Sequence, residues 1–306
     1  MHSKNSVSLL AISILSFADN TVIGTGYSVP YVTPIAPGQI IRLVVQGVGT
    51  ALTQKVSADK YPLPTVLSGI SIEFRQDMTN GSLMFQLPIV SVEPRLCPYF
   101  LTQECGTPSA IIVAQVPFEI NAPGLLPDGS SDGGSPGFLI VSENGVPGAP
   151  LPVVTAFDNI HIVAIVHATD GTPVGPGNGA TPGEYLVMFA YGLGQGAPKT
   201  KTGEPAPIPL STSPPGTSPI TYDFRHNAPP YRGSLPRIAP SFIGLAPGYA
   251  GLYQINFQAP EPPPGDLGCP LGGPLSNVPI YASNVTVNYV GSASFDGVGI
   301  CVNPVQ

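Results

Sequence analysis

The sequence predicts an all-β protein. Short runs of alternating apolar and polar residues recur along the chain, as in strands that bury one face. Proline (39 residues) and glycine (36 residues) separate these runs and are typical of turns, and no long run has the period of a helix. The same series of segments occurs twice in the 306 residues. That recurrence indicates a duplicated unit.

The N-terminal residues 1–18 are interpreted as a secretory signal peptide. His2 and Lys4 give a weakly basic start, the apolar run 7–17 has a fitting length, and 16–18 offers small residues for cleavage. The run is too short to span a bilayer. The alternative is a retained apolar strand, which one subunit could donate to the sheet edge of a neighbour.

Each copy of the duplicated unit opens with a Pro-Gly turn, a strand and a Gly-X-Gly phrase. The expected strands cover 40–46 and 185–191, at an offset of 145 residues. The residues that keep this register are Pro37, Gly38, Gly47, Gly49, Pro182, Gly183, Gly192 and Gly194. In the Gly-X-Gly phrases the glycines are expected to end the strands with positive φ.

Further matched segments follow in the same order in both copies. The expected strand pairs are 69–75 with 219–225, 89–94 with 242–247, and 111–117 with 254–260. Closing strands are expected at 138–141, 152–157, 284–290 and 299–302. The boundary falls near Asp158, with a first domain over 19–158 and a second over 159–306 that begins with the strand 160–168. This inventory predicts two tandem immunoglobulin-like β-sandwich domains.

The stretch 246–260 is the clearest strand signal of the second copy. Tyr253, Ile255 and Phe257 are expected on its core face, with the intervening Gln and Asn side chains on a polar outer face. Pro260 stops the ladder because it has no N–H to donate. We therefore expect an architectural role for this stretch.

The phrases APGQ, GVG, DGT, TPGE, YGLGQG and IGLAPGYAGLYQINFQAP closely resemble the tandem bacterial β-sandwich module of the Solibacter uncharacterised C-terminal domain family. The resemblance covers about residues 27–306 and is strongest over 170–260. It implies a secreted or surface protein of acidobacterial type with no established catalytic residues. The cysteine-bearing inserts at 95–107 and 262–276 depart from the family pattern, so a function specific to this member is expected there.

The four cysteines favour disulfides in an oxidising compartment, because no CxxC spacing indicates a zinc site. Three pairings are possible. Cys97 with Cys105 and Cys269 with Cys301 are preferred, since each pair then lies within one expected domain.

Charge excludes several classes of partner. The formal net charge is −7, and 11 Lys and Arg are too few to neutralise a row of phosphates, so nucleic-acid binding is not expected. The same shortage argues against an anionic membrane surface.

Metal binding is also not expected. His161 and His167 would share a strand face, but without a third ligand they are interpreted as structural. The loop 128–134, DGSSDGG, could hold calcium through carboxylates and carbonyls. It lacks the ligand spacing of an EF-hand, and a flexible turn is the favoured interpretation. No cofactor is predicted.

No catalytic set can be nominated, so the protein is not expected to be an enzyme. The phrase GLGQG at 192–196 lacks the Lys-Ser or Lys-Thr of a phosphate loop. No GxSxG elbow occurs, and Ser, His and Asp do not group. Arg75 and Arg225 are expected to pair with Glu73 and Asp223 on the solvent side of their strands.

The expected function is that of a secreted or cell-surface structural or adhesive protein that mediates protein–protein contact. In its sharper form, subunits associate through strand edges into an extracellular filament. The alternative is an extracellular carbohydrate- or ligand-binding module that uses the loop inserts and tyrosines such as Tyr99 and Tyr281.

Overall fold

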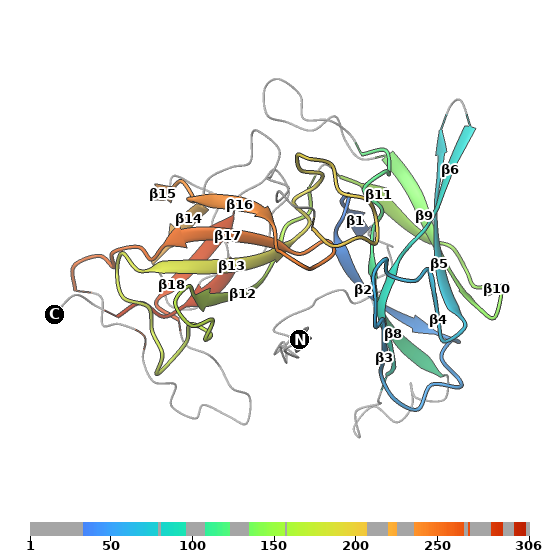
Figure 1. Ribbon diagram of the computed structural model, residues 1–306, viewed down its shortest axis with the longest axis horizontal. Helices are drawn as coiled ribbons and strands as arrows, with labels where there is room; N and C mark the ends of the chain where they lie inside the picture. The colour runs from blue at the N-terminus through green and yellow to red at the C-terminus, as the bar shows by residue number, and fades with distance from the viewer. Residues whose placement is uncertain are drawn as a thin grey trace, which may run out of the picture.

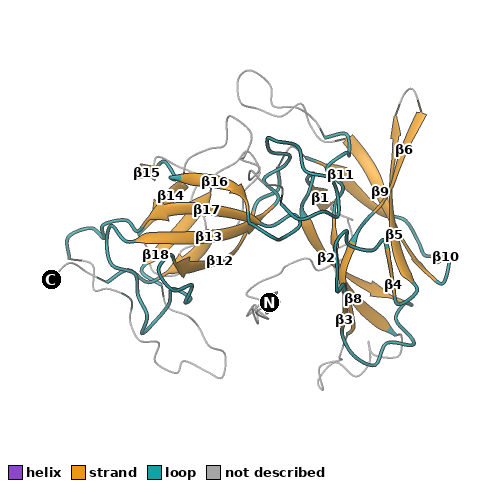
Figure 2. Cartoon of the chain, viewed as in Figure 1, coloured by secondary structure: helices purple, strands orange, loops and turns teal. Residues whose placement is uncertain are grey.

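The computed structural model describes residues 33–78, 81–95, 108–122, 135–156, 158–206, 220–224, 236–265, 269, 283–289 and 297–303. These residues form strands and turns without a helix, as the sequence predicts (Figure 2). Among them, no helix is long and apolar enough to cross a membrane. Segment 1–18, Cys97, Cys105 and the loop 128–134 lie outside the described residues.

Two sheets pack around one hydrophobic core, and together they are called the N-terminal sandwich. The first sheet has the order β1 (Thr33–Ile35), β11 (Leu151–Thr155), β9 (Ser135–Glu143), β5 (Ile70–Met78) and β4 (Val66–Leu67), with β10 (Val146–Pro147) beside β9 and β6 (Gly81–Gln86) beside β5. The second has the order β2 (Ile40–Gln46), β8 (Ser109–Gln115), β7 (Ile89–Pro94) and β3 (Val56–Ser57). Leu43 and Ile112 from one sheet and Ile72 and Phe74 from the other are buried between them.

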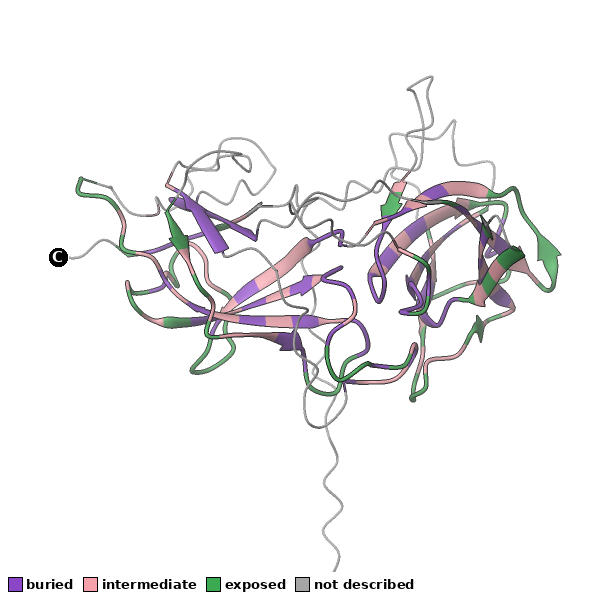
Figure 3. Ribbon diagram, turned by 90° about the horizontal axis from the view of Figure 1, so that it is seen from above, coloured by how far each residue is buried: buried purple, intermediate pink, exposed green. Residues whose placement is uncertain are grey.

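Two further sheets pack around a second core and form the C-terminal sandwich. Their orders are β12 (His161–His167), β13 (Tyr185–Tyr191), β17 (Tyr253–Gln258), β16 (Phe242–Leu245), and β15 (Arg237–Ile238), β14 (Ile220–Asp223), β18 (Val285–Tyr289), β19 (Gly297–Ile300). Tyr253, Ile255 and Phe257 lie in this core, at most 1% exposed, on the face that the sequence predicts. The two sets of strands gather in separate groups in Figure 1, and Figure 3 shows buried and intermediate residues alternating along many of these strands.

The matched segments of the sequence occupy equivalent places in the two sandwiches. The neighbours β2, β8 and β7 correspond to β13, β17 and β16, and all of these pairs are antiparallel. The neighbours β5, β9 and β11 correspond to β14, β18 and β19 in the same way. Even the parallel pair of β1 with β11 has a counterpart, the parallel bridge between Ala180 and Val302. The division into domains at Asp158 stays a prediction.

The Pro-Gly turns that precede β2 and β13 are stabilised by the same kind of hydrogen bond, from a main-chain N–H to a side-chain oxygen. In the first turn the Ala36 N–H donates to Gln39 Oε1 at 2.8 Å, and in the second the Thr181 N–H donates to Glu184 Oε2 at 2.9 Å. A side chain that accepts this bond satisfies a main-chain donor which the turn would leave unpaired. Gln and Glu are therefore interchangeable for this part of the turn.

Glycine is required where β13 ends. Gly192 has a φ of +81°, and a Cβ placed on it would lie 1.9 Å from the main-chain oxygen of Asn159. The other glycines of the repeated phrases also have positive φ: Gly38 (74°), Gly47 (79°), Gly49 (81°), Gly183 (80°) and Gly194 (79°). Residues with a Cβ rarely adopt this conformation.

Buried side chains join the two sandwiches. Gln115, at the end of β8, is fully buried and its Oε1 accepts the Gly203 N–H at 2.7 Å. The Phe118 N–H donates to Thr202 Oγ1 at 2.8 Å, and the Phe118 ring lies in the core of the C-terminal sandwich. These contacts cross between segments that are more than 80 residues apart in the chain.

Asn159 makes a third link. Its Nδ2 donates to the Pro34 carbonyl at 2.9 Å and to Gln39 Oε1 at 3.3 Å. Its own N–H donates to the Gly192 carbonyl at 2.8 Å. The residue is only 7% exposed, so it ties the first turn of one sandwich to the end of β13 in the other.

The expected pairing of Arg75 with Glu73 is wrong. Arg75 lies opposite Phe138 on β9, and its guanidinium stands 5.8 Å from the centre of that ring and 3.7 Å from Asp77. Glu73 lies opposite Gln86 on β6 and accepts a hydrogen bond from it. Arg75 thus pairs with the acid that follows it on its own strand, Asp77, and Glu73 contacts its cross-strand neighbour Gln86. Arg225 lies outside the described residues.

Candidate functional site

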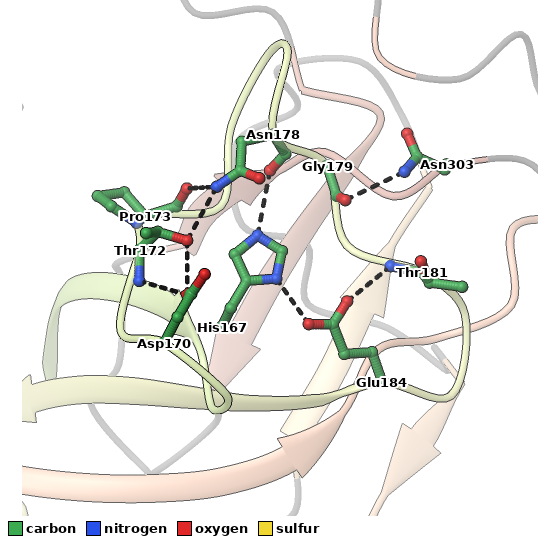
Figure 4. Close-up of polar contacts among 9 residues, drawn as sticks. All are labelled: His167, Asp170, Thr172, Pro173, Asn178, Gly179, Thr181, Glu184 and Asn303. Carbon is green, nitrogen blue, oxygen red and sulfur yellow. Dashed lines mark hydrogen bonds and ion pairs between the residues drawn. The ribbon is translucent and has the colours of Figure 1, made fainter.

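Polar side chains gather where the chain passes from β12 to β13. After β12, Asp170 Oδ1 accepts hydrogen bonds from the N–H and the hydroxyl of Thr172 at 2.9 and 2.7 Å, as in an Asx-turn. Farther along, Asn178 Nδ2 donates to the Thr172 hydroxyl at 3.1 Å and to the Pro173 carbonyl at 3.0 Å (Figure 4). The segment thus folds back over the end of β12.

His167, the last residue of β12, is the centre of this group. Its Nδ1 lies 2.6 Å from Glu184 Oε1, and its Nε2 lies 3.3 Å from the Asn178 carbonyl oxygen (Figure 4). Both neighbours of the ring are acceptors, so only the doubly protonated imidazolium can donate to both. Glu184 binds the ring with one oxygen and the Thr181 N–H with the other.

The electrostatics of the pair favour its ionised form. Burial opposes protonation of His167, but hydrogen bonds to Glu184 and Asn178 and nearby negative charges outweigh it and raise the pKa above the ordinary 6.5. Burial also opposes ionisation of Glu184, but hydrogen bonds from Thr181 and His167 lower its pKa below the ordinary 4.5. Hydrogen bonds from Thr172 lower the pKa of Asp170.

This arrangement is a clamp on the loop. A general base needs a free ring nitrogen within reach of the proton it removes. Both nitrogens of His167 are engaged by acceptors of the protein itself. The pair therefore holds 168–184 against the sandwich, and this accords with the structural interpretation of His167.

The expected shared face of His161 and His167 is wrong. A β-bulge between Ile162 and Ala164 shifts the register of β12, so that His161 lies opposite Tyr191 and His167 opposite Leu186. The extra residue places the two imidazoles on opposite faces of the sheet. Among the described residues, no three His, Cys, Asp or Glu side chains are grouped so that they could hold a metal ion.

A hollow of about 320 Å³ lies beside the clamp, where Cys269 and Cys301 form a disulfide with a Cα–Cα distance of 5.0 Å. This is the pairing that the sequence favours. Asn303 Nδ2 donates to the Gly179 carbonyl at 3.0 Å and closes one side of the hollow. It is lined by Gly175, Gly177, Asn178, Gly179, Cys269, Cys301 and Asn303. The lining offers amides and main-chain groups and carries no charge.

The tyrosines named for ligand binding, Tyr99 and Tyr281, lie outside the described residues. Sequence reasoning missed a different aromatic surface, on the outer face of β13. There Tyr185 is 55% exposed and Phe189 is half-buried, next to the amide side chains of β17. The run 185–191 is apolar throughout, so its sequence predicts a strand but does not distinguish the core face from the outer face.

Neither a protein-family model nor a curated protein matches the sequence. The resemblance to the Solibacter C-terminal module therefore stays a prediction.

Proposed function

We propose that the protein is a secreted or cell-surface structural or adhesive protein that acts through protein–protein contact, and that its subunits associate through strand edges into an extracellular filament. The open edge of β2 is the observation that carries the proposal. In the C-terminal sandwich the equivalent strand β13 is covered by β12, whereas among the described residues β2 pairs with β8 alone. An open edge is a template on which another chain can add a strand.

The hydrogen-bond pattern identifies the groups at this edge. Val116 donates to the Gln39 carbonyl and Gly47 donates to the Pro108 carbonyl, so the odd-numbered residues of β2 face β8. Arg42 and Val44 consequently direct their main-chain N–H and C=O groups away from β8. An incoming strand would pair with these groups. The apolar run 7–17 has the composition of such a strand if it is retained.

The junction between the sandwiches supports the same proposal. Gln115, Thr202 and Asn159 link them through hydrogen bonds that are buried or partly buried. A subunit joined in this way would pass a fixed geometry from one contact to the next. A flexible pair of modules would need no such links.

Two measurements on protein recovered from the culture medium test the proposal. Mass spectrometry identifies the first residue, and negative-stain electron microscopy shows the assembly state. Regular fibres built from chains that keep 7–17 are the expected result. A monomeric chain that begins near Asp19 would contradict association through a donated N-terminal strand.

A further inference from the structure

The outer face of the β12–β13–β17–β16 sheet combines an aromatic row with an amide row. This sheet is the one whose four strands are seen side by side in the left half of Figure 1. Residues at alternate positions of a strand share a face, and the antiparallel register places Tyr185 opposite Gln258 and Phe189 opposite Gln254. The two rows consist of Tyr185, Val187 and Phe189 on β13 and Gln254, Asn256 and Gln258 on β17.

These side chains are not part of the core. The alternate residues of the same strands are buried, among them Leu186 and Met188, whereas Tyr185 is 55% exposed. Gln254 Nε2 donates to Asn256 Oδ1 at 2.9 Å, which holds the two amides side by side. Within the described part of the chain, the side-chain oxygen Oε1 of Gln254 and the side-chain amino group Nδ2 of Asn256 have no hydrogen-bond partner.

The fold does not require this composition, because the N-terminal sandwich has the same strands without it. There β2 and β8 stand in the places of β13 and β17, with the same antiparallel register. The positions equivalent to Tyr185, Phe189, Gln254 and Asn256 carry the aliphatic residues Ile40, Val44, Ile111 and Val113. The aromatic and amide rows are therefore a property of one sheet and call for an explanation beyond strand pairing.

We propose that this face binds a neutral polysaccharide. A sugar ring has an apolar face of C–H groups that packs on an aromatic ring, and a rim of hydroxyls that both donate and accept hydrogen bonds. An amide also offers both donors and acceptors, so it matches such a rim. The residues of both rows are uncharged, and so are Val166 of β12 and Phe242 of β16 beside them. His161, opposite Tyr191 at the end of β13, is a titratable side chain on the same face, and no carboxylate or lysine stands opposite either row. This favours a neutral ligand over an acidic one.

The geometry suits an extended chain. Tyr185 and Phe189 are four residues apart on one strand, about 13 Å at the usual rise. This span is longer than one sugar ring. A dry protein interface would require a partner for every buried amide donor and acceptor, whereas a hydrated sugar rim satisfies them through hydroxyls and water. The amide row therefore favours the polysaccharide.

The inference goes beyond the proposed contact function and does not depend on it. The open edge belongs to β2 in the N-terminal sandwich, and the aromatic and amide rows belong to the C-terminal sandwich. A protein that forms filaments through β2 can bind polysaccharide on the other sandwich, and either property can fail alone.

Affinity gel electrophoresis of the full chain tests the proposal, with gels that contain xyloglucan, galactomannan, mixed-linkage β-glucan or soluble starch. The variants are Tyr185→Ala and Gln254→Ala, and Tyr249→Ala serves as the matched control because Tyr249 is also exposed (44%) but follows β16 outside this face. The expected result is retardation by at least one of these polymers. We expect Tyr185→Ala to weaken it about tenfold or more, and Tyr249→Ala to leave it unchanged. Circular dichroism confirms that each variant is folded.

Three results would overturn the proposal. The first is the absence of retardation by all four polymers, and the second is equal retardation of the wild type and Tyr185→Ala. The third is that Tyr185→Ala lowers the sedimenting mass while no polymer is bound, which would assign the face to a protein contact. If polysaccharide binding fails but assembly through β2 is observed, only the inference about this face falls.

Discussion

Nδ1 of His167 lies 2.6 Å from Oε1 of Glu184, and the same carboxylate accepts the N–H that opens its own turn. In the equivalent turn of the N-terminal sandwich, Gln39 Oε1 accepts the matching N–H. The same oxygen accepts a hydrogen bond from the Asn159 side chain, where Glu184 binds a histidine. The two equivalent turns thus make different contacts. The turn before β13 binds a loop of its own sandwich, and the turn before β2 binds a residue of the other sandwich.

The His167–Glu184 pair predicts a pH window for stability. The pKa of His167 is raised above 6.5 by folding, so its contribution is complete below pH 6.5 and is lost as the pH rises through the folded pKa. The pKa of Glu184 is lowered below 4.5, so its contribution is present above pH 4.5 and is lost as the pH falls through its folded pKa. The pair should therefore stabilise the fold most between these values.

Glu184→Gln isolates this effect, because Gln39 shows that glutamine can close the same turn. We expect the variant to lose about 1–2 kcal/mol of unfolding free energy at pH 6 and less at pH 9, since a hydrogen bond between charged groups disappears. Urea unfolding at both pH values measures this. An equal loss at pH 6 and pH 9 would contradict the charged pair, as would an unchanged His167 pKa in an NMR titration of the variant.

Gly192 and Gly183 form a matched pair for testing the close contact between Gly192 and Asn159. Their φ angles are +81° and +80°, but a Cβ on Gly192 meets the Asn159 carbonyl at 1.9 Å, whereas a Cβ on Gly183 meets nothing within 4 Å. Both alanine variants carry the same backbone strain, about 1–2 kcal/mol. Gly192→Ala should lose a further 1–3 kcal/mol or so from the clash. Equal losses of unfolding free energy in the two variants would show that the close contact is absent.

The sequence predicts some strands better than others. Strands β2 and β13 have the predicted bounds, because each is a short, mainly apolar run between a Pro-Gly turn and a glycine. Strand β6 is missed, since it pairs only with β5 and buries none of its residues fully, and so lacks a regular core face. A period-2 pattern reports burial, so an edge strand in solvent leaves little trace.

Contacts between segments that are distant in the chain could not be predicted from the sequence. Gln115 resembles any polar residue at the end of a strand, yet it is fully buried and binds Gly203. The bulge in β12 is equally invisible, because one extra residue changes no composition and still moves His161 to the opposite face from His167. Such features depend on the pairing partner, which local patterns do not specify.

The Cys269–Cys301 disulfide should contribute substantially to stability, since it closes a loop with a sequence separation of 32. Loop-closure entropy corresponds to about 3–4 kcal/mol for this length. Denaturant unfolding of a Cys269→Ala, Cys301→Ala double variant measures the loss. The reductant response of the same variant reports Cys97 and Cys105 alone and serves as the control. If Cys269 and Cys301 are alkylated in the unreduced native protein, the bond is absent.

Tyr253 tests the core of the stretch that carries the clearest strand signal. Its hydroxyl is buried and donates to the Gly194 carbonyl, and burial raises the pKa of the phenol. Tyr253→Phe should cost about 1–2 kcal/mol, because a buried carbonyl loses its donor. The control Tyr185→Phe removes an exposed hydroxyl and should change the unfolding free energy by less than about 0.5 kcal/mol. Equal effects in urea titrations would contradict this role.

Val44→Pro tests the central proposal most directly. The Val44 N–H faces the open edge of β2, so proline removes a donor that the β2–β8 ladder does not use. Val44→Ala is the control, because it shortens the same side chain and keeps the donor. Sedimentation velocity of the purified chain over a range of concentrations should show assemblies for the wild type and Val44→Ala, and monomers for Val44→Pro. A wild-type chain that stays monomeric at every concentration, or a Val44→Pro chain that assembles as the wild type does, would contradict association through this edge.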